Sequence, residues 1–299
     1  MFTITTHTVQ KIKEPIRLSD YCVSIFDKYI PSRKGIKKAF KRGAFYLNGE
    51  LAKSGDWAKE GQQIELKDLE LTPPKPYEMD LEIIFEDEHF AIINKPAGIS
   101  VSGNQYNTIQ NVVIDSIKIS IKKDALKWTR PVHRLDNQTS GLLVIAKTAS
   151  AIINLSKQFE NKKVKKKYRA IVMGEPPING EINLPIDDKE STSLFKRIET
   201  IDSLQSGKLS LIELEPLTGR THQLRIHCNE SGFQILGDKL HCNKENILLH
   251  KGLFLAAIEL KLTHPETNKE MIFSTNQPSK FDSLIEREKR RWVKFNPQN

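Results

Sequence analysis

The spacing of apolar residues along the chain predicts a mixture of short strands and helices. Apolar runs typical of strands occupy residues 81–85, 90–94, 142–146, 168–173 and 209–214. Apolar residues recur at helical spacing in residues 18–29, 108–122 and 149–159. The strands and helices do not alternate regularly, and this favours an α+β fold over a doubly wound parallel sheet.

The sharpest change in composition lies at residues 71–78, where Pro73, Pro74 and Pro76 occur close together. Proline favours an extended, semi-rigid segment, so we expect a linker here. The organisation that we expect is a small module, this linker, a large domain and a basic tail, over residues 14–70, 71–78, 79–277 and 278–299.

The small module contains a basic helix. Ser32 is expected to cap this helix, and Gly43 is expected to end it in the left-handed conformation. Residues 28–42 include seven basic residues and no acidic one. Ile36, Ala39 and Phe40 have the spacing to face a core, which leaves the other side cationic. The basic residues expected to contact RNA are Arg33, Lys37, Lys38, Lys41 and Arg42.

Five short motifs follow one another in this module. They are Pro31-Ser32-Arg33, Lys37-Lys38, Arg42-Gly43, Leu47-Asn48-Gly49, and Gly61 ahead of Ile64. In this order they resemble the ribosomal protein S-four-type RNA-binding domain. The plain alternative is a solvated basic helix followed by a hairpin at Asn48-Gly49.

Composition narrows the class of protein. A net charge of +9 and a pI near 9.3 favour a polyanionic partner, because basic side chains that neutralise phosphates release counterions. The longest apolar run covers only residues 253–258, far short of the roughly 20 that a membrane helix needs. Residues 1–17 also contain no apolar core of the kind that a secretory signal requires. We therefore expect a cytoplasmic protein with no membrane partner.

The cysteines and histidines do not predict a metal centre. Cys22, Cys228 and Cys242 cannot form a disulfide framework. Three histidines lie near the last two cysteines, but their spacing fits no standard zinc pattern. No glycine-rich phosphate loop is present. We expect neither a metal nor a nucleotide cofactor.

Residues 132–147 join a polar loop to a buried strand, and Asp136 lies in the loop. Loops at strand ends often hold catalytic groups on a rigid scaffold, so Asp136 is a candidate catalytic carboxylate. The alternative is that Asp136 only bonds loop amides, with Gly141 allowing the turn.

Two later segments favour the catalytic interpretation. Residues 218–227 have the pattern of a turn followed by a helix, with Thr221 expected as the N-cap. Arg225 then lies one turn inside, where its guanidinium can hold a buried carboxylate bidentately and favour its charged form. Residues 165–172 form a basic patch leading into a strand. Tyr168 either offers a ring on which a base can stack or packs on the core.

Six motifs occur in a fixed order along residues 80–275. They are Asn94-Lys95-Pro96-Ala97-Gly98; His133-Arg134-Leu135-Asp136 with Thr139-Ser140-Gly141; Lys167-Tyr168; Gly219-Arg220 with His222-Gln223-Leu224-Arg225 and His227; Ile235-Leu236-Gly237-Asp238; and Thr263-His264-Pro265. Together they resemble the RluA-type pseudouridine synthase family. The resemblance implies a catalytic domain with a mixed, mainly antiparallel sheet, preceded by a small α+β RNA-binding domain.

The resemblance also implies roles for individual residues. Asp136 corresponds to the catalytic aspartate, Tyr168 to the aromatic residue that contacts the target base, and Arg225 to the arginine paired with the aspartate. Arg134 corresponds to the side chain that helps to displace the target base. Further RNA contacts are expected from His133, Arg220, His222, Gln223, Lys165 and Lys167.

The sequence departs from the family's pattern in two places. His241-Cys242 stands where the family usually has an aromatic residue followed by glycine. Ser102-Gly103 replaces a frequent His-Pro after the first motif. Both departures are expected to alter the rim that meets RNA and to leave the chemistry intact.

The activity implied is isomerisation of uridine to pseudouridine by a monomer that needs no cofactor. Large-subunit ribosomal RNA is the favoured substrate, and transfer RNA is the alternative. One carboxylate can act as a nucleophile or can abstract a sugar proton, and the sequence leaves both mechanisms open. A non-catalytic RNA-binding factor is the main rival interpretation. A glycosidase or nuclease fits less well, because only Asp136 is marked by a motif and glycosidases normally use two carboxylates.

Overall fold

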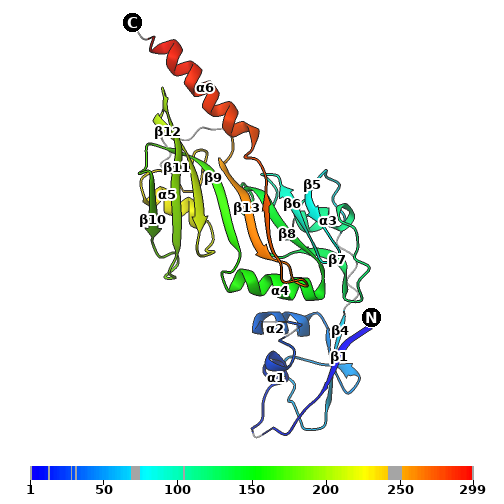
Figure 1. Cartoon of the computed structure of the whole chain (residues 1–299). Helices are drawn as coiled ribbons and strands as arrows, with labels where there is room; N and C mark the ends of the chain where they lie inside the picture. Colours follow the sequence, from blue (N-terminus) through cyan, green and yellow to red (C-terminus); the bar gives the residue numbers. More distant parts are fainter. Residues whose placement is uncertain are drawn as a thin grey trace. The chain divides into compact units, whose positions relative to one another are not determined.

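The computed structural model divides the chain into two units, Met1–Pro74 and Lys75–Asn299 (Figure 1). It describes residues 2–12, 14–27, 29–30, 32–68, 75–103, 105–241 and 251–297. Residues 71–74 of the predicted linker, Pro31 and Cys242 lie outside these ranges. No helix in the described ranges is long and apolar enough to cross a membrane.

The first unit is a four-stranded antiparallel sheet with two helices. Its strands, in sheet order, are β1 (Phe2–Thr8), β4 (Gln63–Asp68), β2 (Phe45–Leu47) and β3 (Glu50–Leu51). The helices are α1 (Leu18–Ile25) and α2 (Arg33–Lys41). Because β1 belongs to this sheet, the unit starts upstream of residue 14, where the module was expected to begin.

The helix cap, the buried helix face and the hairpin predicted for the first unit are all present. The side chain of Ser32 caps α2 by accepting a hydrogen bond from the Gly35 amide at 3.0 Å, and Gly43 follows with φ +77°. Ile36 and Phe40 are buried in the core of the unit. The hairpin at Asn48-Gly49 connects β2 to β3, and both residues have positive φ.

The second unit is built around a ten-stranded mixed sheet. Its strands are β5 (Glu82–Glu86), β6 (Phe90–Lys95), β7 (Ala125–Pro131), β8 (Ser140–Thr148), β9 (Lys165–Met173), β10 (Asn179–Asn183), β11 (Thr192–Ser203), β12 (Gly207–Pro216), β13 (Leu255–Thr263) and β14 (Glu270–Ser274). Along the main path the order is β10-β11-β12-β9-β13-β8-β6-β5, while β14 pairs with β13 and β7 with β8. The pairing is antiparallel except between β13 and β8, which confirms the mixed, mainly antiparallel sheet.

Helices cover this sheet. They are α3 (Ile109–Ser116), α4 (Ala149–Glu160), α5 (Gln223–Glu230) and α6 (Ser279–Phe295). Alternate residues of β8 point to opposite faces, so Leu143 packs with α3 residues while Leu142 packs with α4 residues. Phe281 of α6 is fully buried, so this helix joins the core even though it lies in the predicted basic tail.

The predicted helix over residues 108–122 is too long. The observed helix α3 ends at Ser116, and Ile117 is extended. Beyond it, the Lys118 amide donates to Glu86, and the Ile121 amide donates to the Glu88 carboxylate at 2.9 Å. These carboxylates satisfy amides that a continued helix would have bonded internally, so the chain leaves the helix.

Strand β13 is the seam of the large sheet, because it lies between β9 and β8 (Figure 1). The parallel β13–β8 contact requires a glycine: Gly141 has φ +115°, and a Cβ there would lie 2.1 Å from the Ala257 carbonyl oxygen. The seam therefore joins the half of the sheet that carries Asp136 to the half that carries Tyr168.

Candidate active site

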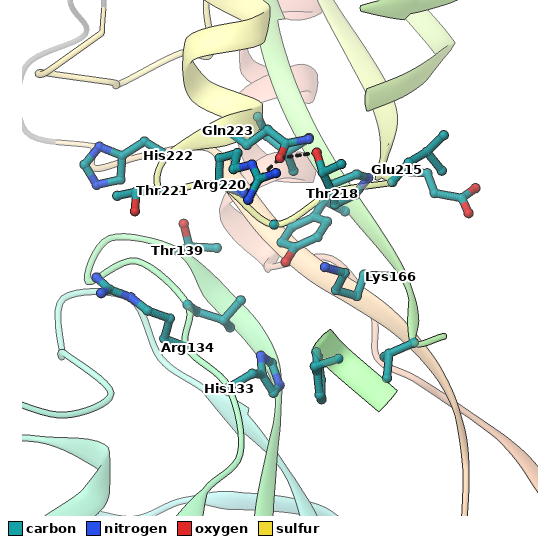
Figure 2. Close-up of a pocket in the computed structure, with 18 of the residues that line it drawn as sticks. His133, Arg134, Thr139, Lys166, Glu215, Thr218, Arg220, Thr221, His222 and Gln223 are labelled. Atoms are coloured by element: carbon teal, nitrogen blue, oxygen red, sulfur yellow. Dashed lines mark hydrogen bonds between the residues drawn. The ribbon is translucent and has the colours of Figure 1, made fainter. Parts of the chain in front are cut away.

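A pocket of about 820 Å³ opens where three segments of the second unit meet. One segment is the loop before β8, one is the start of β9, and one is the turn between β12 and α5. Figure 2 shows the turn residues Arg220 and His222 on one side and His133 and Arg134 on the other. A cavity of this size suits a nucleotide-sized group.

Asp136 lies in the loop before β8 and lines the pocket, with 19% of its side chain exposed. The fully buried Lys95 supports this loop: its ammonium donates to the carbonyls of Ile99 at 2.8 Å and Asn137 at 3.2 Å. Burial lowers the pKa of Lys95 to about 8, and the charge of Asp136 acts in the opposite direction. Lys95 thus ties the two loops around the carboxylate together.

Arg225 lies beside Asp136, but its bidentate partner is a different carboxylate. Nε and one terminal nitrogen of Arg225 each donate to Asp238 at 2.7 Å. The other terminal nitrogen lies 3.5 Å from Asp136 Oδ2. The predicted bidentate interaction between Arg225 and Asp136 is therefore wrong. Arg225 forms its bidentate pair with Asp238, and Asp136 receives a single long contact.

Asp238 belongs to a sequence motif but had no predicted role, and the structure assigns it one. Its carboxylate is fully buried and also accepts hydrogen bonds from the amides of Leu240 at 2.9 Å and His241 at 3.1 Å. Hydrogen bonds and the charge of Arg225 hold the pKa of Asp238 below its usual range, although burial alone would raise it. One buried anion therefore orients both Arg225 and the turn at residues 238–241.

Tyr168 lines the pocket from strand β9, where it pairs with Leu214 of β12 and Ala257 of β13. Its ring also packs against the cores on both sides of the seam. Burial, and then the nearby charge of Asp136, raise the pKa of Tyr168, so the phenol stays neutral. The ring therefore packs on the core and also lines the pocket.

The lysines of β9 divide between its two faces. Lys167 faces away from Tyr168 and lies 3.4 Å from Glu259 and 3.9 Å from Glu213. Lys165 is exposed and reaches the pocket lining. Lys166, which was not among the predicted site residues, shares the face of Tyr168 and lines the pocket (Figure 2). Burial lowers the pKa of Lys166, and no described carboxylate pairs with it.

His133 and Arg134 occupy the same edge of the pocket but differ in their surroundings. Nε2 of His133 accepts a hydrogen bond from the Val144 amide at 3.1 Å, and its ring stacks on Phe159. Burial lowers the pKa of His133 to about 3, so the ring is neutral. Arg134 is exposed in the pocket and forms no ion pair with any described residue. Arg134 is thus free to meet an anionic ligand, while His133 is part of the scaffold.

Gln223 fixes the turn before α5. Its side-chain oxygen accepts hydrogen bonds from the Thr218 hydroxyl at 2.7 Å and the Arg220 amide at 3.0 Å. Its nitrogen donates to the Thr192 carbonyl at 2.9 Å. The guanidinium of Arg220 donates to the Glu190 carbonyl. Gln223 is buried and Arg220 half-buried, so both shape the pocket wall.

His222, and not the predicted Thr221, is the N-cap of α5. It has φ +55° and forms no side-chain capping bond. The backbone amide of Gln223 donates to the Arg220 carbonyl at 3.2 Å, so a backbone hydrogen bond within the turn takes the place of a threonine cap. In this conformation Nε2 of His222 lies 3.8 Å from Oδ1 of Asp136. The backbone strain therefore directs an imidazole toward the carboxylate.

The predicted RNA-contact residues of the first unit share one surface. Arg33, Lys37, Lys38, Lys41 and Arg42 are all exposed on or next to α2. Arg33 pairs with Asp20 at 2.8 Å, so most of the positive charge on this helix comes from the other four residues and from Lys34, which is also exposed.

Among described residues, no group of three or more histidine, cysteine or acidic side chains is arranged to hold a metal. His227 instead lies 2.9 Å from the Ser191 hydroxyl and 3.1 Å from the Leu184 carbonyl. His227 is therefore a buried structural residue of α5.

Comparison with known proteins relates the chain to one family. Residues 89–230 match the family model described as RNA pseudouridylate synthase. The dual-specificity RNA pseudouridine synthase RluA of Haemophilus influenzae is 37% identical over 221 residues, covering 69% of this chain and 96% of that protein. The ribosomal large subunit pseudouridine synthase C of Rickettsia typhi is 33% identical and covers 89% of this chain and 95% of its own length.

A solved structure agrees on the fold. Human RNA pseudouridylate synthase domain containing 1 superposes with a TM-score of 0.56 at 23% identity, over 68% of this chain and 86% of that chain. At that identity the likeness concerns the arrangement of the sheet and helices.

Proposed function

Since the chain belongs to the RluA-type RNA pseudouridine synthase family, whose members isomerise uridine in RNA, we propose that Asp136 performs this reaction in the pocket described above. The observation that carries the proposal is the convergence of three elements on one carboxylate. Arg225 lies 3.5 Å from Asp136, His222 lies 3.8 Å from it, and Tyr168 lines the same pocket.

The reaction breaks the bond between ribose C1′ and uracil N1, turns the uracil, and joins C1′ to C5. The hydrogen on C5 leaves as a proton and N1 gains one, so no redox partner is consumed. Asp136 can attack as a nucleophile or can abstract a sugar proton. In either case Arg225 offers a fixed positive charge next to the carboxylate.

We propose that the target base is turned out of its stack into the pocket. Extruding a base costs a few kcal/mol, so contacts inside the pocket must offset it. Tyr168 supplies a flat face for the base, and the exposed guanidinium of Arg134 is placed to enter the gap left behind. Lys165 and Lys166 at the pocket wall supply cationic contacts for the flanking phosphates.

For the substrate, we propose large-subunit ribosomal RNA in the cytoplasm, with transfer RNA as the alternative. The name of the Rickettsia typhi relative and its coverage of almost the whole chain support the first choice. The first unit contributes affinity through the exposed cations of α2, as the resemblance to S-four-type domains implies. We expect the enzyme to act as a monomer, which light scattering of the free protein would check.

The experiment is tritium release from large-subunit ribosomal RNA labelled at uracil C5. Wild-type protein should release tritium, and Asp136→Asn and Asp136→Ala should release none while binding the RNA with nearly unchanged affinity. Arg225 keeps its partner Asp238 in both variants, so we expect them to fold. Full activity in either variant would remove Asp136 from the mechanism. Intact binding by an inactive wild-type protein would favour a non-catalytic RNA-binding factor.

A further inference from the structure

His222 and His241 form a hydrogen-bonded pair of imidazoles next to Asp136. Nδ1 of His222 lies 2.9 Å from Nε2 of His241, and the rings meet at 72° with centroids 5.1 Å apart. The other nitrogen of His222, Nε2, faces Oδ1 of Asp136. His222 therefore stands between a carboxylate and a second imidazole.

The carboxylate restricts where the protons of this pair can lie. A neutral His222 with its proton on Nδ1 would turn the Nε2 lone pair toward the anionic oxygens of Asp136, which is repulsive. The favoured neutral form carries its proton on Nε2 and needs a donor for Nδ1, and Nε2–H of His241 lies at the right distance to donate. If His222 is instead fully protonated, His241 serves as the acceptor. Either way, His241 keeps an N–H of His222 directed at Asp136.

Both rings are held by backbone that the structure fixes independently. His222 is fixed by its left-handed conformation at the start of α5. His241 is fixed by its amide, which donates to the buried carboxylate of Asp238. The same carboxylate accepts two hydrogen bonds from Arg225, so Asp238 holds both His241 and the guanidinium that lies beside Asp136.

The charged groups around His241 favour its neutral form. Burial lowers the pKa of His241, and the charges of Arg225 and His222 act in the same direction. The carboxylates of Asp238 and Asp136 oppose this shift but do not reverse it. A neutral His241 can both donate and accept through Nε2, depending on its tautomer, as the pairing with His222 requires.

We propose that His241 is a positioning residue that acts on Asp136 through His222 and tunes its reactivity. The proposal rests on the proposed function of Asp136. His241 does not line the pocket, so it acts without touching RNA there. An aromatic hydrocarbon at this position could pack against His222 but could not supply the hydrogen bond.

The test compares His241→Leu, which deletes the hydrogen bond, with His241→Gln, whose amide can replace Nε2 as donor or acceptor. Leu240→Ala is the control, because Leu240 is 69% exposed in the same turn and contacts neither imidazole through a hydrogen bond. Tritium release from C5-labelled large-subunit ribosomal RNA is measured from about pH 5.5 to about pH 9, that is, from about one unit below the ordinary histidine pKa to about two and a half units above it.

We expect His241→Leu to lower kcat by about 5- to 10-fold, the effect of one neutral hydrogen bond, with KM for RNA unchanged. It should also change the acid limb of the pH profile. His241→Gln should recover kcat to within about 3-fold of wild type, and Leu240→Ala should match wild type. A wild-type-like rate and pH profile in folded His241→Leu would overturn the inference, as would a decrease in His241→Gln equal to that in His241→Leu.

A measurement on the unmodified protein covers the case in which His241→Leu does not fold. Nitrogen-15 spectra of labelled histidine should show His222 either protonated on Nε2 alone or fully protonated. A proton on Nδ1 alone would overturn the proposal. If wild-type protein releases no tritium from ribosomal or transfer RNA, the proposed function itself fails, and the role of His241 fails with it.

Discussion

Replacing Asp238 by asparagine should destabilise the second unit, because it removes the carboxylate that holds Arg225 beside Asp136. The substitution keeps the shape of the side chain but removes the charge that holds Arg225 through two 2.7 Å hydrogen bonds. It also places an amide NH₂ group against donors, since the guanidinium and two backbone amides already point at this position. Arg225 is then left as a buried cation whose only remaining carboxylate among the described residues is Asp136, at 3.5 Å.

The size of the effect follows from the burial of the pair. Removing one partner of a buried ion pair typically destabilises a protein by about 3–5 kcal/mol. We expect the lower end, about 3 kcal/mol, because Asp136 still offsets part of the arginine's charge. For a unit of this size that destabilisation corresponds to a decrease in Tm of about 6–12 °C.

The effect should depend on pH in a defined direction. The pKa of Asp238 is lower in the folded protein than in the unfolded chain. Its contribution is therefore fully present above the unfolded pKa of about 3.9, and it disappears as pH falls through the lower folded value. The difference between wild type and Asp238→Asn should stay constant from about pH 5 to 8 and shrink only in stronger acid.

Differential scanning calorimetry at several pH values measures this effect. The control is Glu270→Gln, because Glu270 forms an ion pair with Lys261 in the same unit but is 63% exposed. We expect the control to melt like wild type, since exposed ion pairs contribute little. A Tm of Asp238→Asn within about 2 °C of wild type, or an equal shift in the control, would refute the assignment of Asp238 as the anchor of Arg225.

Further predictions concern binding, stacking and the seam. Replacing Lys37, Lys38 and Lys41 by glutamine should weaken RNA binding and reduce the slope of log Kd against log salt by about 0.7–0.9 for each phosphate that is no longer neutralised, with the melting of the second unit unchanged. An unaltered slope in binding titrations would argue that α2 does not meet RNA. Tyr168→Ala should lower turnover by about 5- to 150-fold, the range that corresponds to one base stacking on an aromatic ring, while Tyr168→Phe should keep most of it. Equal decreases in the two variants would instead implicate the hydroxyl. Gly141→Ala should prevent stable folding, because its Cβ would lie 2.1 Å from a carbonyl oxygen of β13; a soluble variant with normal Tm would contradict that close approach.

Features that depend on neighbouring residues were predictable from the sequence. Helix α2 is the clearest case, since its cap, its end and its buried face all follow from short-range chemistry. Asp136 and Tyr168 were predicted in another way, from family motifs at the ends of strands, and both line the pocket. In contrast, the partner of Arg225 depends on which carboxylate the fold brings close, and the motifs contain two.

Strand β13 shows a second limit. Its apolar residues were noticed only as a run too short for a membrane helix, although this strand is buried on both faces at the centre of the sheet. Periodicity does not separate such a segment from a buried helix. Strands β10, β11 and β14 were also not assigned, because polar residues interrupt their apolar pattern and their pairing is decided by distant partners.

The position of β13 affects the order in which the large sheet can form during synthesis. Residues 255–263 are translated long after Asp136 and Tyr168, yet they are the strand through which the two halves of the sheet are hydrogen-bonded to each other. Until this late segment leaves the ribosome, the aspartate and the tyrosine belong to separate pieces of unfinished sheet. A nascent chain that lacks this strand therefore cannot hold Asp136 and Tyr168 in one continuous sheet.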